Sequence, residues 1–276
     1  MSSAQSPRKV LLVVHPSRDD SQKYAEEFRS LLVAAGFEVS SDSAEGAELA
    51  VVLGGDGTIL RAAQLCRGFD IPILGINLGS VGFMAEIHKP STKELLAAVE
   101  NRSYKYEQRL VAHYSIHRDG KEVANGWALN EVVIEGVPGA MIQLFVHIDS
   151  HPLSRWGCDG VICATPTGST AYAFSVGGPV VWPEVPALIL LPIAAHALFS
   201  RPMVVSPDSS IAIDVESNDA HLFADGFRRT DLKVGDRVVI TRDAHTVSLG
   251  HIGDSSFTDR LVAKFQLPVE GWRGEK

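Results

Sequence analysis

The chain has 276 residues, of which 45% are hydrophobic and 21% are charged, a composition typical of a globular protein with one large or two ordinary domains. Its formal net charge of -8 argues against a nucleic-acid-binding protein, which would usually carry a basic excess. The three cysteines, Cys66, Cys158 and Cys163, form no CxxC pair, so we expect reduced, buried thiols and a cytoplasmic location. The apolar run at 187–199 contains a proline and is too short to span a bilayer, so we expect no membrane association.

The first hundred residues alternate short apolar runs with segments of helical periodicity. Strands are predicted at "KVLLVVHP", "ELAVVLGG" and "IPILGIN". Helices are predicted between them, one closed by Gly36 and one running to about Cys66, and a third covers "STKELLAAVENRS". Ser91 and Glu94 form a capping-box pattern at the start of that third helix. Alternating strands and helices predict a parallel, Rossmann-like sheet in an α/β domain over residues 1–104.

The pattern changes near Tyr104, where short segments begin to alternate apolar with polar residues. Turn signals recur at Asp119-Gly120, Asn125-Gly126, Asp225-Gly226 and Gly235-Asp236. These features predict a mostly antiparallel all-β domain over residues 105–254. The tail at 255–276 reads as a helix with an apolar stripe, and we expect it to return to the first domain.

The stretch "LGGDGTIL" at 53–60 predicts a strand, a glycine-rich turn and a helix start. Gly54, Gly55, Gly57 and Thr58 would form a phosphate-donor loop, because glycines expose backbone N–H groups and a helix N-terminus attracts anions. Asp56 lies in the middle of this loop. Its carboxylate has three possible roles: general base, metal ligand or helix cap. Three glycines around it favour a functional role over a cap.

Three other stretches carry polar groups in unusual settings. "CDGVICATPTGSTAYAFSVGGPV" at 158–180 predicts either a close-fitting polar pocket wall or a turn-rich hairpin with ordinary capping. In "WALNEVVIE", Asn130 and Glu131 lie between apolar residues, so they need partners or a ligand to offset their desolvation, unless they simply end a strand. His147, Asp149 and His151 would share one side of a strand, as a metal site requires, although a solvated strand edge is the favoured interpretation.

Taken together and in this order, "LGGDGT", "NLGSVGF", "LNE", "DG" and "TPTGSTAY" resemble the NAD kinase family over essentially the whole chain. Diacylglycerol and sphingosine kinases and phosphofructokinases carry loops related to GGDGT, whereas "TPTGSTAYAFSVGGP" is much more specific. "HALFSRP" and the C-terminal segment resemble the actinobacterial branch. The resemblance implies transfer of the terminal phosphoryl group of ATP, or of polyphosphate, to the 2′-hydroxyl of the adenosine ribose of NAD, giving NADP. It also implies a homodimer or homotetramer that binds small molecules and neither nucleic acid nor membrane.

The resemblance assigns roles to individual residues. Asp56 would be the general base, and Arg61 would meet phosphate. Asp159 would bind the nicotinamide end, and Ala194 would line the adenine pocket, often across a subunit contact. The full set of residues implied to bind NAD is Asp56, Gly57, Arg61, Asn130, Glu131, Asp159, Thr170, Ala171, Tyr172, Ala173, Phe174, Ser175 and Ala194, with Asp225 and Gly226 near the site. Mg²⁺ would arrive on ATP, with no dedicated protein site beyond a possible contact from Asp56.

The chain departs from the family pattern at two places. Ser80 replaces a longer, often basic residue, and Ala194-Ala195 stand where relatives carry polar side chains, so contacts from those side chains are not expected here. Two alternatives compete with the NAD kinase interpretation. One is a lipid or sphingoid-base kinase that shares the GGDGT loop, and the other is an NAD(P)-sensing module without turnover.

Overall fold

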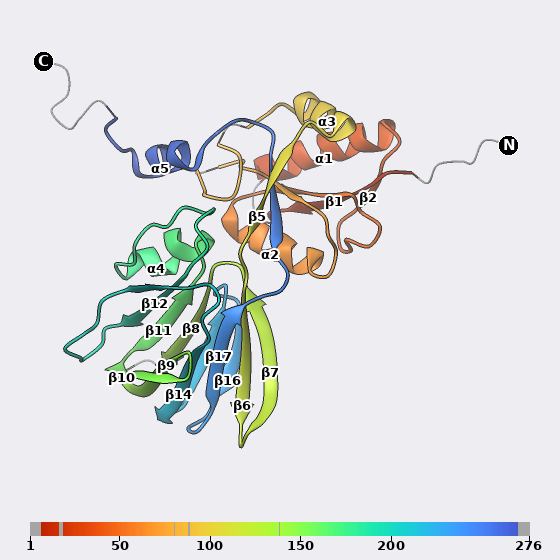
Figure 1. Cartoon of the computed structure of the whole chain (residues 1–276). Helices are drawn as coiled ribbons and strands as arrows, with labels where there is room; N and C mark the ends of the chain where they lie inside the picture. The colour runs from red at the N-terminus through yellow and green to blue at the C-terminus, as the bar shows by residue number, and fades with distance from the viewer. Residues whose placement is uncertain (1–6, 17–18, 80, 88, 138, 270–276) are drawn as a thin grey trace, which may run out of the picture. The chain divides into compact units, whose positions relative to one another are not determined.

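In a computed structural model, which describes residues 7–16, 19–79, 81–87, 89–137 and 139–269, the chain divides into two compact units (Figure 1). Unit 1 consists of Met1–Gln108 and Val247–Lys276, and unit 2 consists of Arg109–Thr246. Among the helices of these described residues, none is long and apolar enough to cross a membrane.

Unit 1 is built around a six-stranded sheet, sheet A, with the strand order β2-β1-β3-β4-β18-β5. The pairs β1–β2, β1–β3, β3–β4 and β4–β18 are all parallel. The elements are β1 (Lys9–Val14), α1 (Asp19–Ala34), β2 (Glu38–Ser40), β3 (Leu49–Leu53), α2 (Asp56–Cys66), β4 (Ile73–Ile76), α3 (Thr92–Asn101), β5 (Lys105–Arg109), β18 (Val247–His251) and α5 (Phe257–Phe265).

Successive strand residues point to opposite faces of sheet A, and each face is covered by helix. One face packs against α1 and α3, with Phe28, Leu32 and Leu95 fully buried against the strands. The other face packs against α2, where Ile59 approaches β4 so closely that a Cβ on Gly75 would lie 2.4 Å from the Ile59 side chain. Both faces of a parallel sheet are therefore buried, which explains the continuous apolar runs in the sequence. The predicted capping box of α3 is confirmed, with Ser91 and Glu94 as its members.

Residues 247–251 belong to unit 1, whereas the alternating pattern predicts 105–254 as the second domain. They form β18, which pairs with β4 through Leu249 and Gly250. The short "VSLGH" run has no feature that separates it from the preceding antiparallel strands, so its partner is not evident from sequence. α5 follows and also belongs to unit 1, as the prediction of a returning C-terminal helix required.

Unit 2 contains two six-stranded sheets: sheet B has the order β10-β9-β14-β17-β6-β7, and sheet C has the order β13-β12-β11-β8-β15-β16. The pairings within both sheets are antiparallel, so the predicted fold class is confirmed. The elements are β6 (Ala112–Arg118), β7 (Lys121–Ala128), β8 (Glu131–Gly136), β9 (Ile142–Ile148), β10 (His151–Cys158), β11 (Gly160–Ala164), the 3-10 helix η1 (Thr167–Thr170), α4 (Tyr172–Ser175), β12 (Leu188–Ile193), β13 (Met203–Val205), β14 (Ile211–Ser217), β15 (Ala220–Ala224), β16 (Arg228–Leu232) and β17 (Arg237–Arg242).

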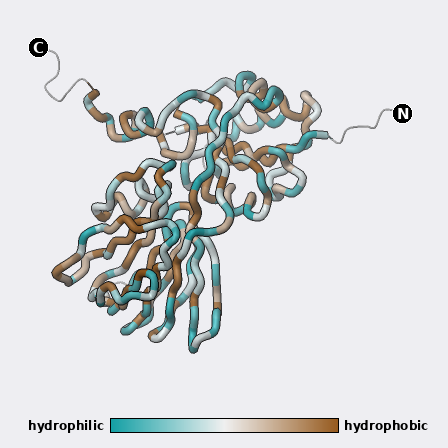
Figure 2. The backbone as a smooth tube through the Cα atoms, viewed as in Figure 1, coloured by the Kyte–Doolittle hydropathy of each residue, from teal (hydrophilic) through white to brown (hydrophobic). Residues whose placement is uncertain are grey.

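Alternating side chains of sheet C enter two different cores. Val132 and Ile134 pack with residues of sheet B, including the fully buried Trp156. Val133 points to the opposite face, where Ala173 of α4 and Val181 cover the sheet. β11 and β12 likewise supply residues to both cores, and Figure 2 shows the hydrophobic backbone stretches in this part of the chain. α4 and the loop after it are thus held against one face of sheet C.

One predicted turn is wrong. Asn125 and Gly126 lie inside β7, and the Asn125 amide donates a hydrogen bond to Glu122. A Cβ on Gly126 would lie 2.5 Å from the Tyr114 hydroxyl oxygen on the paired strand. The glycine is therefore needed for cross-strand packing instead of for a turn. The predicted turn at Asp225-Gly226 is confirmed, since both residues have positive φ angles between β15 and β16.

Candidate active site

Asp56 is the first residue of α2, directly after the glycine turn that leaves β3. The N-cap is Gly55, and no side chain caps the helix, so Asp56 is not a capping residue. Its half-buried carboxylate accepts two backbone hydrogen bonds from another loop, one from the Phe83 N–H at 2.9 Å and one from the Met84 N–H at 3.0 Å. Each carboxylate oxygen is fixed by one bond and keeps a further lone pair for another partner.

The glycines of this loop divide into two kinds. A Cβ on Gly54 would lie 2.4 Å from the Thr58 hydroxyl oxygen, so Gly54 is required for packing. Gly55 and Gly57 have nothing within 4 Å of the same position. Their backbone is open at a helix N-terminus, which is where an anionic group binds.

Gly82 was not among the predicted site residues. A Cβ there would lie 2.3 Å from Oδ1 of Asp56, so only glycine lets the loop come close enough to donate its N–H groups. The "NLGSVGF" motif that contains Gly82 was the available signal. The same motif contains Ser80, which lies outside the described residues. Arg61 is exposed on α2.

In unit 2, Asn130 and Glu131 are buried at the start of β8 and held by Asp225. The Asp225 carboxylate accepts the N–H of Asn130 at 2.6 Å and the N–H of Leu129 at 3.1 Å, and it pairs with the Arg228 guanidinium. The Asp225 N–H donates to the Glu131 carbonyl at 3.0 Å. Asp225 therefore fixes the backbone of the Asn130-Glu131 pair, with Gly226 completing the turn.

The "TPTGSTAY" stretch encloses the same pair from the other side. Thr165 donates its hydroxyl to the Leu129 carbonyl at 2.5 Å and its N–H to the Asn130 carbonyl at 2.8 Å. A Cβ on Gly168 would lie 2.0 Å from the Asn130 carbonyl oxygen. The longer stretch at 158–180 forms β11, η1 and α4, so the hairpin alternative is wrong.

The side chains of Asn130 and Glu131 present unused polar atoms. Within the described residues, Oδ1 of Asn130 and Oε2 of Glu131 are buried and accept no hydrogen bond, although the two residues are only 8% and 5% exposed. Burial and the charge of Asp225 raise the pKa of Glu131 to about 8, against the opposing effect of the Tyr172 N–H. Buried polar atoms are rarely left unpaired, which makes this pair a candidate ligand-binding site.

The remaining predicted residues of unit 2 lie along β8 and near its C-terminal end, away from Glu131. Tyr172 donates its hydroxyl to Glu135 at 2.9 Å, which places α4 along β8 from Glu131 to Glu135. Asp159 is exposed, and its N–H donates to the Ile193 carbonyl next to the exposed Ala194. Of the other α4-region residues, Ala173 is buried, Phe174 and Ser175 are exposed, and Thr170 and Ala171 are half-buried.

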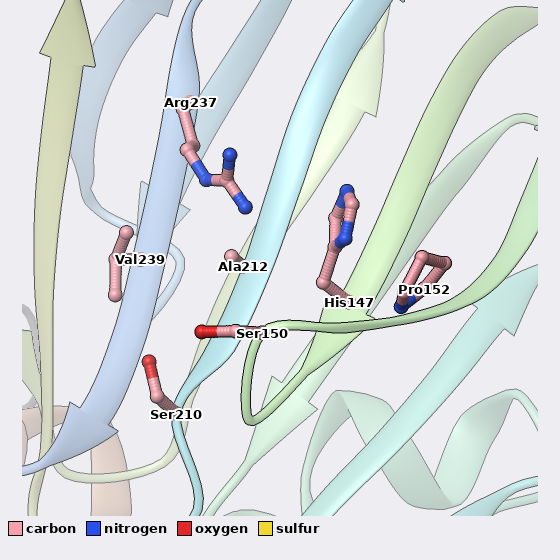
Figure 3. A pocket seen from close by; sticks show the side chains of 7 residues that line it. All are labelled: His147, Ser150, Pro152, Ser210, Ala212, Arg237 and Val239. Atoms are coloured by element: carbon pink, nitrogen blue, oxygen red, sulfur yellow. The ribbon is translucent and has the colours of Figure 1, made fainter. Parts of the chain in front are cut away.

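A groove of about 530 Å³ on sheet B contains none of these residues (Figure 3). It is lined by His147, Ser150, Pro152, Ser210, Ala212, Arg237 and Val239. His147 bonds to Asp214 at 3.0 Å, whereas the Asp149 carboxylate accepts bonds from Ser209 and Ser210. In the part of the chain that the structure describes, no three His, Cys, Asp or Glu side chains gather as a metal site would require.

Two family models match the chain. The ATP-NAD kinase N-terminal domain matches residues 41–104, which include Asp56, and the ATP-NAD kinase C-terminal domain matches residues 129–251, which include Asn130 and Asp225. The NAD kinase of Thermobifida fusca (strain YX) is 51% identical over 244 residues, 86% of this chain and 75% of that one. The chain belongs to the NAD kinase family. The predicted resemblance is thereby confirmed.

Further similarities within the NAD kinase family cover nearly all of the chain. The NAD kinase of Mycobacterium bovis is 43% identical over 303 residues, 97% of this chain and 99% of that one. The crystal structure of an NAD kinase from Archaeoglobus fulgidus in complex with ATP is 30% identical, with a TM-score of 0.74, and covers 94% of this chain and 98% of that one. Thermobifida and Mycobacterium are both actinobacteria, so the predicted branch is also confirmed.

Proposed function

We propose that this chain transfers the terminal phosphoryl group of ATP to the 2′-hydroxyl of the adenosine ribose of NAD, producing NADP, with Asp56 as the general base. The role of Asp56 is supported by the orientation of its carboxylate, which the Phe83 and Met84 N–H groups hold. Beside it are two glycines, Gly55 and Gly57, with no atom within 4 Å of the position that a Cβ would take. A structural carboxylate would need no such open backbone next to it.

The chemistry assigned to Asp56 is a single proton transfer. The 2′-hydroxyl gives its proton to a carboxylate oxygen as its own oxygen forms a bond to the γ-phosphorus of ATP, and the bond from that phosphorus to the β–γ bridging oxygen breaks to release ADP. A positioned base of this kind contributes ~10²–10⁴-fold to a rate. The remaining task is alignment and charge neutralisation, as in other phosphoryl transfers.

We propose that Gly55, Gly57 and the N-terminus of α2 bind the donor phosphates, and that Mg²⁺ enters as part of the Mg-ATP substrate. When bound, the metal neutralises charge on the phosphoryl oxygens. Arg61, which is exposed on the same helix, supplies a further cation for phosphate.

For unit 2 we propose binding of NAD through Asn130 and Glu131. Oε2 of Glu131 and Oδ1 of Asn130 are buried polar atoms aimed at no described partner. With its pKa raised to about 8, Glu131 is mostly protonated at neutral pH and presents a hydroxyl donor, while Asn130 presents an acceptor. Tyr172, Asp159 and Ala194 are proposed as further contacts.

The test is the conversion of NAD to NADP by the pure protein with ATP and Mg²⁺, read with an NADP-specific dehydrogenase. We expect Asp56→Asn to lower kcat by ~10²–10⁴-fold, because the amide cannot take a proton. The matched control is Asp70→Asn, at an exposed aspartate in the loop after α2, which should retain activity. Near-normal turnover in Asp56→Asn, with NADP formed by the wild type, would reject the base assignment.

The same assay separates the alternatives. Tight NAD binding without NADP formation would indicate a sensing module, and phosphorylation of a lipid or sphingoid base with no response to NAD would indicate a lipid kinase. Replacing ATP by polyphosphate tests the second donor.

We also propose a cytoplasmic homodimer or homotetramer. The free, buried state of Cys66, Cys158 and Cys163 supports a reducing compartment. Leu198 and Phe199, both highly exposed in the loop between β12 and β13, support burial against another subunit. Light scattering after gel filtration measures the oligomeric state, and a monomer would contradict this proposal.

A further inference from the structure

The loop that holds Asp56 is itself bound by an arginine of the C-terminal helix. Arg260 of α5 is only 2% exposed, and its Nη1 donates to the Phe83 carbonyl at 2.9 Å. That carbonyl belongs to the same peptide unit as the Met84 N–H, which donates to Oδ1 of Asp56 at 3.0 Å. The guanidinium and the carboxylate therefore bind opposite ends of one peptide group.

Two further side chains, both half-buried, fix the position of this arginine. Its Nη2 lies 2.8 Å from Nδ1 of His251, and because arginine only donates, Nδ1 is the acceptor. Nε2 of His251 is then the protonated nitrogen in the neutral ring and donates to Glu107 at 3.0 Å. Burial lowers the pKa of Arg260, against the opposing effect of the charges of Glu107, Glu86 and Asp56.

Aromatic side chains pack α5 against the same loop. The centroid of the Phe83 ring lies 5.9 Å from the ring centroids of both Phe257 and Phe265. A capping box of Ser256 and Asp259 stabilises the N-terminus of α5. The base of the loop is anchored separately, since Glu86 bonds through its N–H to Gly75 and accepts the Ile252 N–H.

We infer that Arg260 is a positioning residue for phosphoryl transfer, acting on Asp56 through the peptide group between Phe83 and Met84. This inference rests on the proposed role of Asp56 as the base. A cation at the carbonyl end polarises the peptide and strengthens hydrogen bonding at its N–H end. It also fixes the direction of that N–H and hence of the carboxylate.

The test compares two variants of α5 in the full chain. Arg260→Met removes the guanidinium and keeps an apolar stem, and we expect kcat to fall ~10–100-fold with little change in KM for NAD or ATP, because the base is misplaced and substrate binding is not. Lys264→Met is the matched control. Lys264 donates to the Val81 carbonyl at 2.8 Å, so it also joins α5 to the loop, but through a peptide unit that is not one of the two donating to Asp56. Its kcat should stay near that of the wild type.

A double variant distinguishes positioning of Asp56 from a merely structural role of Arg260. Adding Arg260→Met to Asp56→Asn should cause little further loss of turnover, because the residue through which Arg260 acts is already gone. A full further loss in the double variant would overturn the inference, as would a folded Arg260→Met enzyme with wild-type kcat. Normal turnover in Asp56→Asn alone would instead reject the base assignment on which the inference rests.

Arg260→Lys provides the second route if Arg260→Met does not fold. Its ammonium keeps the charge but has no fork with which to bond both Phe83 and His251. We expect a kcat below that of the wild type at unchanged KM and, where Arg260→Met folds, above the kcat of that variant. A wild-type kcat in a folded Arg260→Lys enzyme would overturn the role of the arginine geometry.

Discussion

Glu131 and Asp225 are neighbouring buried carboxyl groups with different partners. Asp225 accepts two backbone N–H groups and pairs with Arg228, interactions that favour its ionised form, although burial still raises its pKa. Glu131 has one N–H donor, from Tyr172, and its pKa rises to about 8. Because two adjacent buried charges repel each other, the charge of Asp225 favours the protonated form of Glu131.

Replacing Glu131 by glutamine should change how stability depends on pH. The unfolded glutamate titrates near 4.5 and the folded one near 8, so between these values the folded state binds more protons than the unfolded state. The contribution of Glu131 to stability is therefore complete below pH 4.5 and is lost as the pH rises through 8. Glutamine does not titrate, so Glu131→Gln lacks this pH-dependent loss of stability. In urea unfolding from about pH 4 to 9, the unfolding free energy of Glu131→Gln relative to that of the wild type should therefore rise with pH.

Glu184→Gln serves as the control for this measurement, since Glu184 is exposed in the same unit. It should leave the pH dependence unchanged. Parallel curves for wild type and Glu131→Gln would mean that Glu131 is not protonated in the folded protein near neutrality.

The turn between β3 and α2 shows how one motif combines packing with ligand access. A Cβ on Gly54 would clash with the Thr58 side chain. Gly57 lies in the first turn of α2, and a Cβ there would meet no atom within 4 Å. The sequence "LGGDGT" does not distinguish these two glycines. Which of them is packed and which is open depends on how α2 is oriented, and only the structure shows this.

Alanine at these two positions should have opposite effects on stability. We expect Gly54→Ala to cost about 1–3 kcal/mol of unfolding free energy through overpacking against Thr58. Gly57→Ala should retain or slightly raise stability, because alanine is favoured over glycine within a helix, yet it should raise KM for ATP by obstructing the phosphates. Thermal unfolding and ATP titration of kcat measure both effects, and equal stability losses would contradict the assignment.

Elements defined by contacts between residues close in the sequence could be predicted, whereas those defined by distant contacts could not. The α3 capping box and the Asp225-Gly226 turn depend on neighbours within a few residues, and both were predicted. Asn125-Gly126 carries the same local signal as a turn, but both residues pair with β6, where the Tyr114 side chain leaves no room for a Cβ at position 126. Gly82 and Arg260 act through contacts 26 and 177 residues away, respectively, which no local pattern reveals.

Unit 1 is completed by chain segments from both ends of the sequence. β18 lies between β4 and β5 in sheet A, and α5 packs on the loop that holds Asp56. The Gln108 side chain bonds to Ser248 across 140 residues. The apolar stripe predicts the helix but not the unit on which it packs, and the strand before it resembles its antiparallel predecessors too closely to be placed.

A chain ending at Thr246 should fail to form unit 1. It lacks β18, which leaves β5 without its neighbour in sheet A and one edge of β4 unpaired, and it lacks Arg260. Limited proteolysis should cut within residues 9–104 of this shortened chain and leave the same region of the full chain protected. A chain ending at Val269 keeps both elements and should remain protected, and equal protection of both shortened chains would show that β18 is dispensable.

The insertion of β18 between β4 and β5 also sets a time order in the cell. During translation, β4 and β5 leave the ribosome long before the strand that belongs between them is made. The aspartate of the glycine loop is therefore synthesised early but acquires its complete support only after Arg260 has emerged. We therefore expect a nascent or prematurely terminated chain to carry the intact GGDGT motif without kinase activity.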